Sequence, residues 1–124
     1  MLPFKNRLSK RKDHERVQKL GGFVSFNNIA IKALENGTND TRIGIVVGIK
    51  YSKKAVERNL AKRKIQEAVR SEIKNIKKGL DVVIMARKRD EEKTKNINFG
   101  ENIAEALKKG GLLKNIKEEQ SSQK

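Results

Sequence analysis

The stretch that decides the fold is KYSKKAVERNLAKRKIQEAVR, residues 50–70. Seven of the fifteen residues from Lys50 to Lys64 are basic, and Glu57 is the only acidic residue among them. The spacing predicts an amphipathic helix with one continuous stripe, formed by Arg58, Lys62, Ile65, Val69, Ile73 and Ile76. The apolar half should pack on a core, whereas the cationic half cannot be buried without partners. We therefore expect the N-terminal turns to overhang a sheet edge and to direct Arg58 and Lys62 toward a polyanion.

The segments on either side of this helix predict a mixed sheet. Residues 42–49, RIGIVVGI, alternate as a strand, with Ile43, Ile45, Val47 and Ile49 on one face. Residues 81–87, DVVIMAR, form a continuous apolar run of the kind found in strands covered on both faces. A strand, a helix and a strand in this order indicate a β-α-β unit with parallel pairing. We expect the helix to begin near Ser52 or Ala55, to continue to Lys78 and to stop at Gly79.

The remaining segments complete the predicted order. Ser9 is expected to cap a short helix that reaches about Leu20 and ends at Gly21-Gly22. Residues 23–34 indicate a strand with a turn or bulge at Asn27-Asn28, and the ENGTND segment at 35–40 is a turn. A last helix is expected over about Phe99–Lys109.

The predicted fold class is α+β. We expect a mixed α-β sandwich in which helices pack on a mixed sheet, in the order α-β-β-(β)-α-β-α with a β-α-β crossover. Residues 1–113 are predicted to form a single domain, followed by a polar, flexible tail at 114–124.

The charge of the chain indicates a nucleic-acid partner. The 124 residues carry a formal net charge of +15, and residues 1–90 hold 23 Lys and Arg against 9 Asp and Glu. Such an excess favours phosphate contacts and counterion release. An anionic membrane surface is the rival partner, but no long apolar face accompanies the basic one. No apolar run approaches the roughly 18 residues that span a bilayer. The basic N-terminus lacks the apolar segment of a signal peptide, so a cytoplasmic location is expected.

The residues that usually carry catalysis are scarce. The chain has no cysteine, which excludes disulfides and thiolate metal sites, and its single histidine, His14, excludes a histidine-rich metal cluster. The carboxylates are mostly single and lie among basic residues, and no glycine-rich phosphate loop is present. We therefore predict no catalytic residue and no metal site in the protein itself, and no small-molecule substrate.

Two groups of basic residues are candidates for RNA contact. In the first group, Lys53, Lys54 and Arg58 lie at a helix N-terminus, where each cation costs roughly several tenths of a kcal/mol. This cost favours contact with RNA or DNA over a merely solvated helix start. The second group lies in and before the first helix and either solubilises the chain or contacts phosphate; it consists of Arg7, Lys10, Arg11, Lys12, Arg16 and Lys19. The thin apolar content of that helix favours the contact.

The aromatic residues are few: four phenylalanines, one tyrosine and no tryptophan. Phe23 and Phe26 are expected in the core. Tyr51, in a basic setting, suits either stacking on a base or packing at the strand end. His14, alone on a polar helix, is expected at the surface.

These segments together resemble the protein subunit of bacterial ribonuclease P. The matching pieces follow the family's order: NRL at 6–8, KRKDHERV at 10–17, RIGIVV at 42–47 and DVVIMARK at 81–88. The family signature A-V-x-R-N-x-x-K-R-x-x-x-E is similar to Ala55, Val56, Arg58, Asn59, Lys62, Arg63 and Glu67. The resemblance covers about residues 3–109, and the signature with its flanking strands is its specific part.

The resemblance implies a fold and a role. The fold would be the ribosomal protein S5 domain 2-like sandwich. The catalytic subunit would be an RNA, and the protein would bind it and the 5′ leader of precursor tRNA, assisting Mg²⁺-dependent cleavage at the mature 5′ end. The positions implied to contact the RNA subunit are Arg58, Asn59, Lys62 and Arg63, with Lys50, Lys53 and Lys54 extending that surface and Arg7, Arg11 and Lys12 on the second one.

The sequence departs from the family pattern at several positions. The third residue of the usual R-N-R triplet is Leu60, and a later arginine is Gln66. Aromatic residues that line the leader cleft in the family are replaced by His14, Gln18 and Lys32. We therefore consider three alternatives for the leader: it is held by hydrogen bonds and charge, it is held more weakly, or it stacks on the imidazole of His14.

Two other functions remain open from the residues alone. A small ribosomal or general RNA-binding protein shares the charge and accounts for the missing cleft aromatics; it would bind many RNAs with a steep salt dependence. A protein-only nuclease is the third reading, which the lack of a carboxylate cluster for metal ions disfavours.

Overall fold

The computed structural model describes residues 6–87 and 99–113. Within these residues the elements are α1 (Arg11–Leu20), β1 (Gly22–Phe26), β2 (Ile29–Glu35), β3 (Arg42–Val46), α2 (Ala55–Glu72), a 3₁₀ turn η2 (Ile73–Asn75), β4 (Leu80–Ala86) and α3 (Phe99–Lys109). The predicted α+β class is confirmed, and the optional strand of the predicted order α-β-β-(β)-α-β-α is present. The stretch predicted as one strand over residues 23–34 is the antiparallel pair β1 and β2, because the chain turns at Asn27-Asn28. The predicted tail at 114–124 lies outside the described residues.

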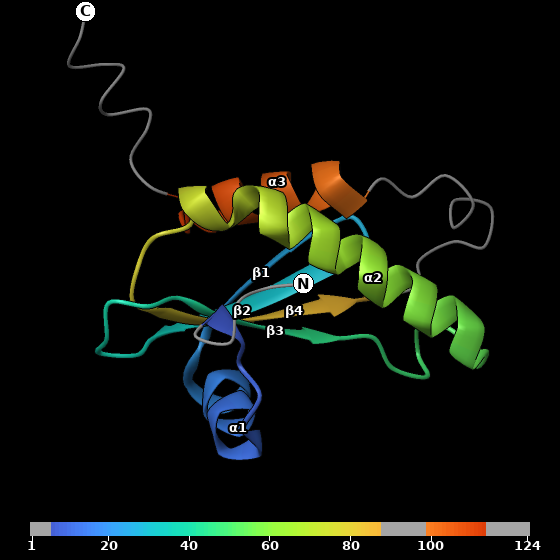
Figure 1. The fold of residues 1–124 in the computed structure, drawn as a ribbon, viewed down its shortest axis with the longest axis horizontal. Helices are drawn as coiled ribbons and strands as arrows, with labels where there is room; N and C mark the ends of the chain where they lie inside the picture. Colours follow the sequence, from blue (N-terminus) through green and yellow to red (C-terminus); the bar gives the residue numbers. More distant parts are fainter. Residues whose placement is uncertain (1–5, 88–98, 114–124) are drawn as a thin grey trace, which may run out of the picture.

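The four strands form one mixed sheet in the order β1-β2-β4-β3. β2 is antiparallel to β1 and β4, and β3 is parallel to β4, so β3, α2 and β4 form the predicted β-α-β unit. α1 lies on one face of the sheet, and α2 and α3 lie on the other (Figure 1). The two faces are therefore available for different tasks.

The main core lies between the sheet and the α2–α3 layer. It gathers alternate strand residues such as Ile31, Ile43 and Ile84 against Ile65 of α2 and Leu107 of α3. A smaller cluster of Leu8, Val17 and Val83 lies under α1. β4 is buried on both faces, as its continuous apolar run predicts.

Three predicted boundaries are wrong. β3 ends at Val46 rather than residue 49, because the chain turns there with Tyr51 N–H donating to Gly48 O at 2.9 Å; Ile49 is consequently 68% exposed instead of sharing the inner face. Lys10, not Ser9, occupies the N-cap of α1, without a side-chain cap bond. These errors concern local turns, which hydrophobic periodicity does not encode.

The third error is the end of the long helix. α2 stops at Glu72 and tightens into η2, after which Ile76 is extended and bridges to Leu113. The helix ends at this point because the extended backbone at Ile76 places its side chain in the core. Gly79 instead turns the chain into β4 with φ +81°, and a Cβ there would lie 2.6 Å from Thr38 O.

Candidate nucleic-acid interface

The N-terminal half of α2 overhangs the sheet as predicted. The first buried residue of this helix is Ala61, followed by Ile65 and Val69, whereas Val56 is 78% exposed. Figure 1 shows the N-terminal turns of α2 extending beyond the strands. The helix is therefore anchored by its second half, and its first half is free to meet a partner.

Arg58 has a role inside the protein as well as a place on this surface. Its side chain is half-buried, and Nη1 donates to Ser52 O at 2.9 Å. Ser52 Oγ in turn accepts from Lys54 N–H at 3.1 Å and donates to Glu57 Oε1. These bonds hold the turn that leads into α2, which positions the lysines on it. The sequence identified Arg58 as a member of this site but not Ser52 or Glu57, because neither of these two residues belongs to the run of basic residues that marked the site.

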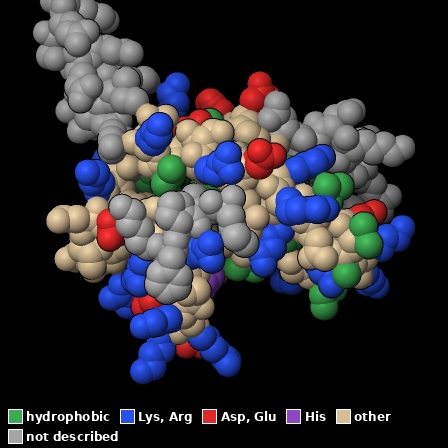
Figure 2. Space-filling model, in the orientation of Figure 1, with side chains coloured by type: hydrophobic (Ala, Val, Ile, Leu, Met, Phe, Trp, Pro, Cys, Tyr) green, Lys and Arg blue, Asp and Glu red, His purple; other side chains and the backbone are tan. Residues whose placement is uncertain are grey.

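The other signature residues point to solvent. Asn59, Lys62 and Arg63 are exposed, as are Lys50, Lys53 and Lys54. Asn59 and Arg63 are four residues apart and share a helix face. Apolar side chains lie among these cations: Ile49, Val56 and Leu60 are 68%, 78% and 45% exposed. Figure 2 shows the resulting mixture of hydrophobic and basic side chains at this end of α2.

A pocket of about 270 Å³ lies at the edge of β3, between α2 and the segment before α1. Lys62 and Gln66 of α2 form one side, and Arg7 and His14 lie on the other. Leu8 N–H donates to Ile43 O at 2.9 Å, so the segment before α1 is attached along the edge strand β3. The two predicted groups of RNA-contacting residues therefore meet at this pocket.

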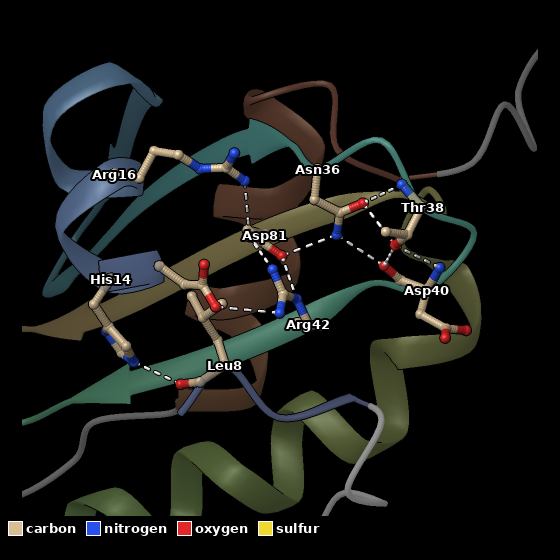
Figure 3. A network of polar contacts seen from close by, with 9 residues as sticks. Leu8, His14, Arg16, Asn36, Thr38, Asp40, Arg42 and Asp81 are labelled. Atoms are coloured by element: carbon tan, nitrogen blue, oxygen red, sulfur yellow. Dashed lines mark hydrogen bonds and ion pairs between the residues drawn. The ribbon is translucent and has the colours of Figure 1, made fainter. Parts of the chain in front are cut away.

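A polar network attaches α1 to the other face of the sheet (Figure 3). Its centre is Asp81, which is fully buried in β4. Arg42 holds this carboxylate with two hydrogen bonds, from Nε at 2.8 Å and from Nη2 at 2.7 Å, and Asn36 Nδ2 donates at 2.9 Å. From α1, Arg16 pairs with Asp81 at 3.4 Å and Asp13 pairs with Arg42 at 3.2 Å. Arg16, predicted to contact phosphate, thus contributes to fixing its own helix.

The network shifts the pKa values of Asp81 and Arg42. Burial is the largest influence on Asp81 and raises its pKa, but the hydrogen bonds from Arg42 and Asn36 and the charges of Arg42 and Arg16 outweigh it, so the pKa of Asp81 is lowered. The hydrogen bond to Asp81 raises the pKa of Arg42. Both groups are therefore charged at neutral pH, and the attachment of α1 is ionic.

The three leader-cleft candidates lie together between α1 and the sheet. His14 packs on Gly44 of β3, because a Cβ added to Gly44 would lie 2.4 Å from His14 Cε1. The Nε2 of His14 is hydrogen-bonded to Leu8 O. Gln18, one turn further on, donates to Met85 Sδ at 3.5 Å. Lys32 Nζ donates to Gln18 O at 2.7 Å. His14 is half-buried, so the prediction of a surface histidine is only partly right.

The sheet surface beside α1 exposes Phe23, an aromatic residue that was expected in the core. Phe23 is 58% exposed, so its expected place in the core is wrong, whereas Phe26 packs against the core as predicted. The alternation along β1 explains the difference: Phe23 shares a face with the polar Ser25, and Val24 shares the opposite face with Phe26. That alternation was the signal available in the sequence. Val46 of β3, 39% exposed, lies on the same face as Phe23.

The remaining aromatic candidate packs inside the domain. Tyr51 is half-buried, and its ring centroid lies 6.4 Å from that of Phe99. Burial, followed by the charge of Glu57, raises the pKa of the Tyr51 hydroxyl. Of the two roles considered for Tyr51, the structure thus shows packing at the strand end.

Lys and Arg side chains dominate the visible surface of α1 and lie along α2 (Figure 2). Arg11 and Lys12 on α1 are exposed, and so is Arg7 just before it. Among residues 6–87 and 99–113, no three histidine or acidic side chains gather as a metal site would require. No helix in these residues is long and apolar enough to cross a membrane. The described chemistry is that of a polyanion-binding surface.

Comparison with known proteins agrees with this geometry. The family model described as Ribonuclease P matches residues 2–110. The ribonuclease P protein component of Pseudanabaena sp. is 40% identical over 85 residues, 68% of this chain and 73% of that protein, and its counterpart from Dehalococcoides mccartyi is 38% identical over 82 residues, 66% of each chain.

Solved structures give the same result. The ribonuclease P protein of Thermotoga maritima has a TM-score of 0.73 at 32% identity, covering 83% of this chain and 96% of that one. The Staphylococcus aureus protein has a TM-score of 0.74 at 25% identity, covering 88% and 98%. The chain therefore belongs to the ribonuclease P protein family, whose members are the protein component of the endoribonuclease that processes the 5′ ends of tRNAs.

Proposed function

We propose that this chain binds the catalytic RNA of ribonuclease P through the overhanging half of α2 and the 5′ leader of precursor tRNA through α1 and the pocket beside it at β3. The observation that carries the proposal is the pocket at β3, where Lys62 from α2 faces His14 and Arg7 from the other side. One protein edge then contacts both RNAs.

The α2 surface suits the catalytic RNA. Arg58 would face phosphate with the N–H groups that Ser52 does not use, and Lys62 and Arg63 would add exposed charge on the same helix. Asn59 would supply an amide to phosphate or a 2′-OH. The lysines at positions 50, 53 and 54 would extend this contact around the turn before α2. Because α2 is anchored by its buried second half, these groups hold fixed positions when RNA docks.

The α1 surface suits a single-stranded leader. Arg7, Arg11 and Lys12 supply exposed charge before and along the start of the helix. His14 lines the pocket at β3, and Gln18 and Lys32 lie further along the contact between α1 and the sheet. A site that offers a ring, an amide and an ammonium would fit an unpaired strand better than a duplex, since the bases of an unpaired strand are accessible.

Cleavage itself would be carried out by the RNA with Mg²⁺. Mg²⁺ prefers oxygen ligands such as carboxylates, and the described residues gather no such cluster. The ion would therefore be held by RNA and substrate oxygens, and the protein would contribute position and charge. The reaction would take place in the cytoplasm, where precursor tRNA is processed.

The test is cleavage of a 5′-extended precursor tRNA at low Mg²⁺ by a bacterial ribonuclease P RNA, with and without this protein. We expect the protein to restore accurate cleavage that the RNA alone cannot sustain. Binding to the RNA without any gain in cleavage would refute the proposal. RNA-free protein, stringently purified, serves as the control and should not cleave.

General RNA binding is the second candidate function. The specific observation in its favour is that positions 14, 18 and 32 hold His, Gln and Lys and no Phe, Tyr or Trp. It predicts equal affinity for precursor and mature tRNA and a steep salt dependence. A clear preference of the protein–RNA complex for the precursor would exclude it.

A further inference from the structure

Two apolar side chains, Val56 and Leu60, are exposed on the overhanging half of α2. Val56 is 78% exposed and Leu60 is 45% exposed. They are four residues apart, so they lie next to each other on consecutive turns of the helix. At 3.6 residues per turn, they lie on the side of α2 opposite to its buried residues, Ala61, Ile65 and Val69. Packing inside the domain therefore explains neither side chain.

The exposed apolar pair is confined to the overhang. In the anchored half of α2, the same outer side continues with Arg63, Glu67 and Arg70, which are all exposed. A helix side that faces only water is expected to be polar along its whole length. The outer side of α2 instead becomes apolar where the helix extends beyond the sheet (Figure 1). This change indicates that a partner covers the outer side of the overhang.

The charges around the pair determine which partner fits. Lys53 and Lys54 precede α2 and are exposed, and Arg63 follows Leu60 by about one turn. A second copy of this chain would bring the same cations and a net charge of +15 to the contact, so it would be repelled. RNA fits both features, because its phosphates pair with cations while its unpaired bases offer flat faces to side chains.

The opposite side of the overhang is cationic. Arg58 and Lys62 extend the buried stripe of Ile65 and Val69 toward the helix N-terminus. Apolar and cationic groups therefore lie on opposite sides of the helix end formed by residues 55–60, which is about 9 Å long at roughly 1.5 Å per residue. A partner that contacts both sides has to enclose this helix end, since a flat surface would reach only one of them.

We propose that the overhanging half of α2 inserts into a cleft of the catalytic RNA, where Val56 and Leu60 pack against the face of an unpaired base. This inference rests on the proposed binding of that RNA by α2 and adds a contact that carries no charge. At position 60, where the family pattern has arginine, this chain has replaced a charged contact by an apolar one. The pair would favour an RNA with an extruded base at this place over one that presents only phosphates.

The test measures the affinity of this protein for a bacterial ribonuclease P RNA over a range of salt concentrations. The variant combines Val56→Thr with Leu60→Asn, which nearly keeps the size of both side chains and changes no charge. We expect its affinity to fall roughly tenfold, the effect of leaving about two methyl-sized groups in water. The slope of log affinity against log salt should be unchanged, because no phosphate contact is lost.

Leu20→Asn is the matched control. Leu20 is 65% exposed at the end of α1, so the same apolar surface is removed away from α2, and this variant should bind the catalytic RNA as tightly as the wild type. Urea denaturation of the double variant should show a stability close to that of the wild type, since both substituted side chains are exposed. Chemical probing of unpaired bases should reveal at least one base that the wild type protects and the double variant leaves reactive.

Three results would overturn the inference: wild-type affinity in the double variant, a loss of affinity with a smaller salt slope, or an equal loss in Leu20→Asn. Self-association of the wild type that the double variant abolishes would assign the apolar pair to a second copy of the chain instead. If the wild type does not bind the catalytic RNA at all, the proposed function fails, and this inference fails with it.

Discussion

Helices α1 and α2 lie on opposite faces of one sheet and are held there by different kinds of interaction. α2 buries Ala61, Ile65 and Val69 in the main core. α1 buries a single residue, Val17, and relies on ion pairs from Asp13 and Arg16 to the sheet. In a chain of net charge +15, a helix rich in cations has little apolar surface to offer, so it is fixed by carboxylates instead. The two proposed RNA surfaces should therefore fail under different conditions.

The largest effect is expected from breaking the apolar attachment. Ile65→Ala leaves a cavity in the main core, where Ile65 is fully buried, and should lower the free energy of unfolding by about 2–5 kcal/mol. Urea denaturation of the protein alone measures it. Leu60→Ala, on the exposed side of the same helix, is the control and should change stability little; a similar loss in both variants would contradict the anchoring of α2 by its buried face.

The ionic attachment is broken by Asp81→Asn. Arg42 and Arg16 would lose the charge that they pair with, and we expect a loss of roughly 3 kcal/mol in the free energy of unfolding, as for a buried ion pair that loses one partner. Glu15→Gln is the control, because the pair of Glu15 with Arg11 is exposed and should contribute little. Unchanged stability in Asp81→Asn would show that the ion pairs of Asp81 do not stabilise the fold.

The pH dependence sharpens the comparison. The pKa of Asp81 is lower in the folded protein than the ordinary aspartate value of 3.8, so the stability that this carboxylate contributes is fully present above about pH 4. It is lost as the pH falls from there through the lower folded pKa. Denaturation measured between neutral pH and pH 2 should show a smaller acid-induced loss in Asp81→Asn than in the wild type. Parallel curves for the two proteins would rule out this role of Asp81.

The smallest effect concerns the pocket where the two surfaces meet. Lys62→Ala should weaken binding to the catalytic RNA a few-fold and reduce the slope of log affinity against log salt by about one, as expected for one lost phosphate contact. Lys64→Ala removes the same side chain from an exposed position outside this pocket and is the matched control. Equal salt slopes in the two variants would place the RNA elsewhere on α2.

Much of the fold and part of the interface were predictable from local pattern. The stripe that begins at Arg58 and becomes apolar at Ile65 predicted both the anchored and the overhanging half of α2. The boundaries of α3 were predicted as Phe99–Lys109, and the structure has the same bounds. The ends of β3 and α2 were not predictable, because a turn at Gly48 and the burial of Ile76 against distant residues determine them.

The sequence by itself determined the periodicities, and with them the elements, the β-α-β unit and the polyanion-binding character that follows from its charge. Tertiary structure decided which side chains those elements expose. Asp81 became the centre of a buried network because Arg42 and Arg16 approach it from another strand and from α1. Phe23 stayed in solvent because β1 is an edge strand whose Phe23 face α1 leaves open. Local spacing assigns each side chain to one face of its element, whereas the burial and pairing of that face depend on residues far apart in the chain.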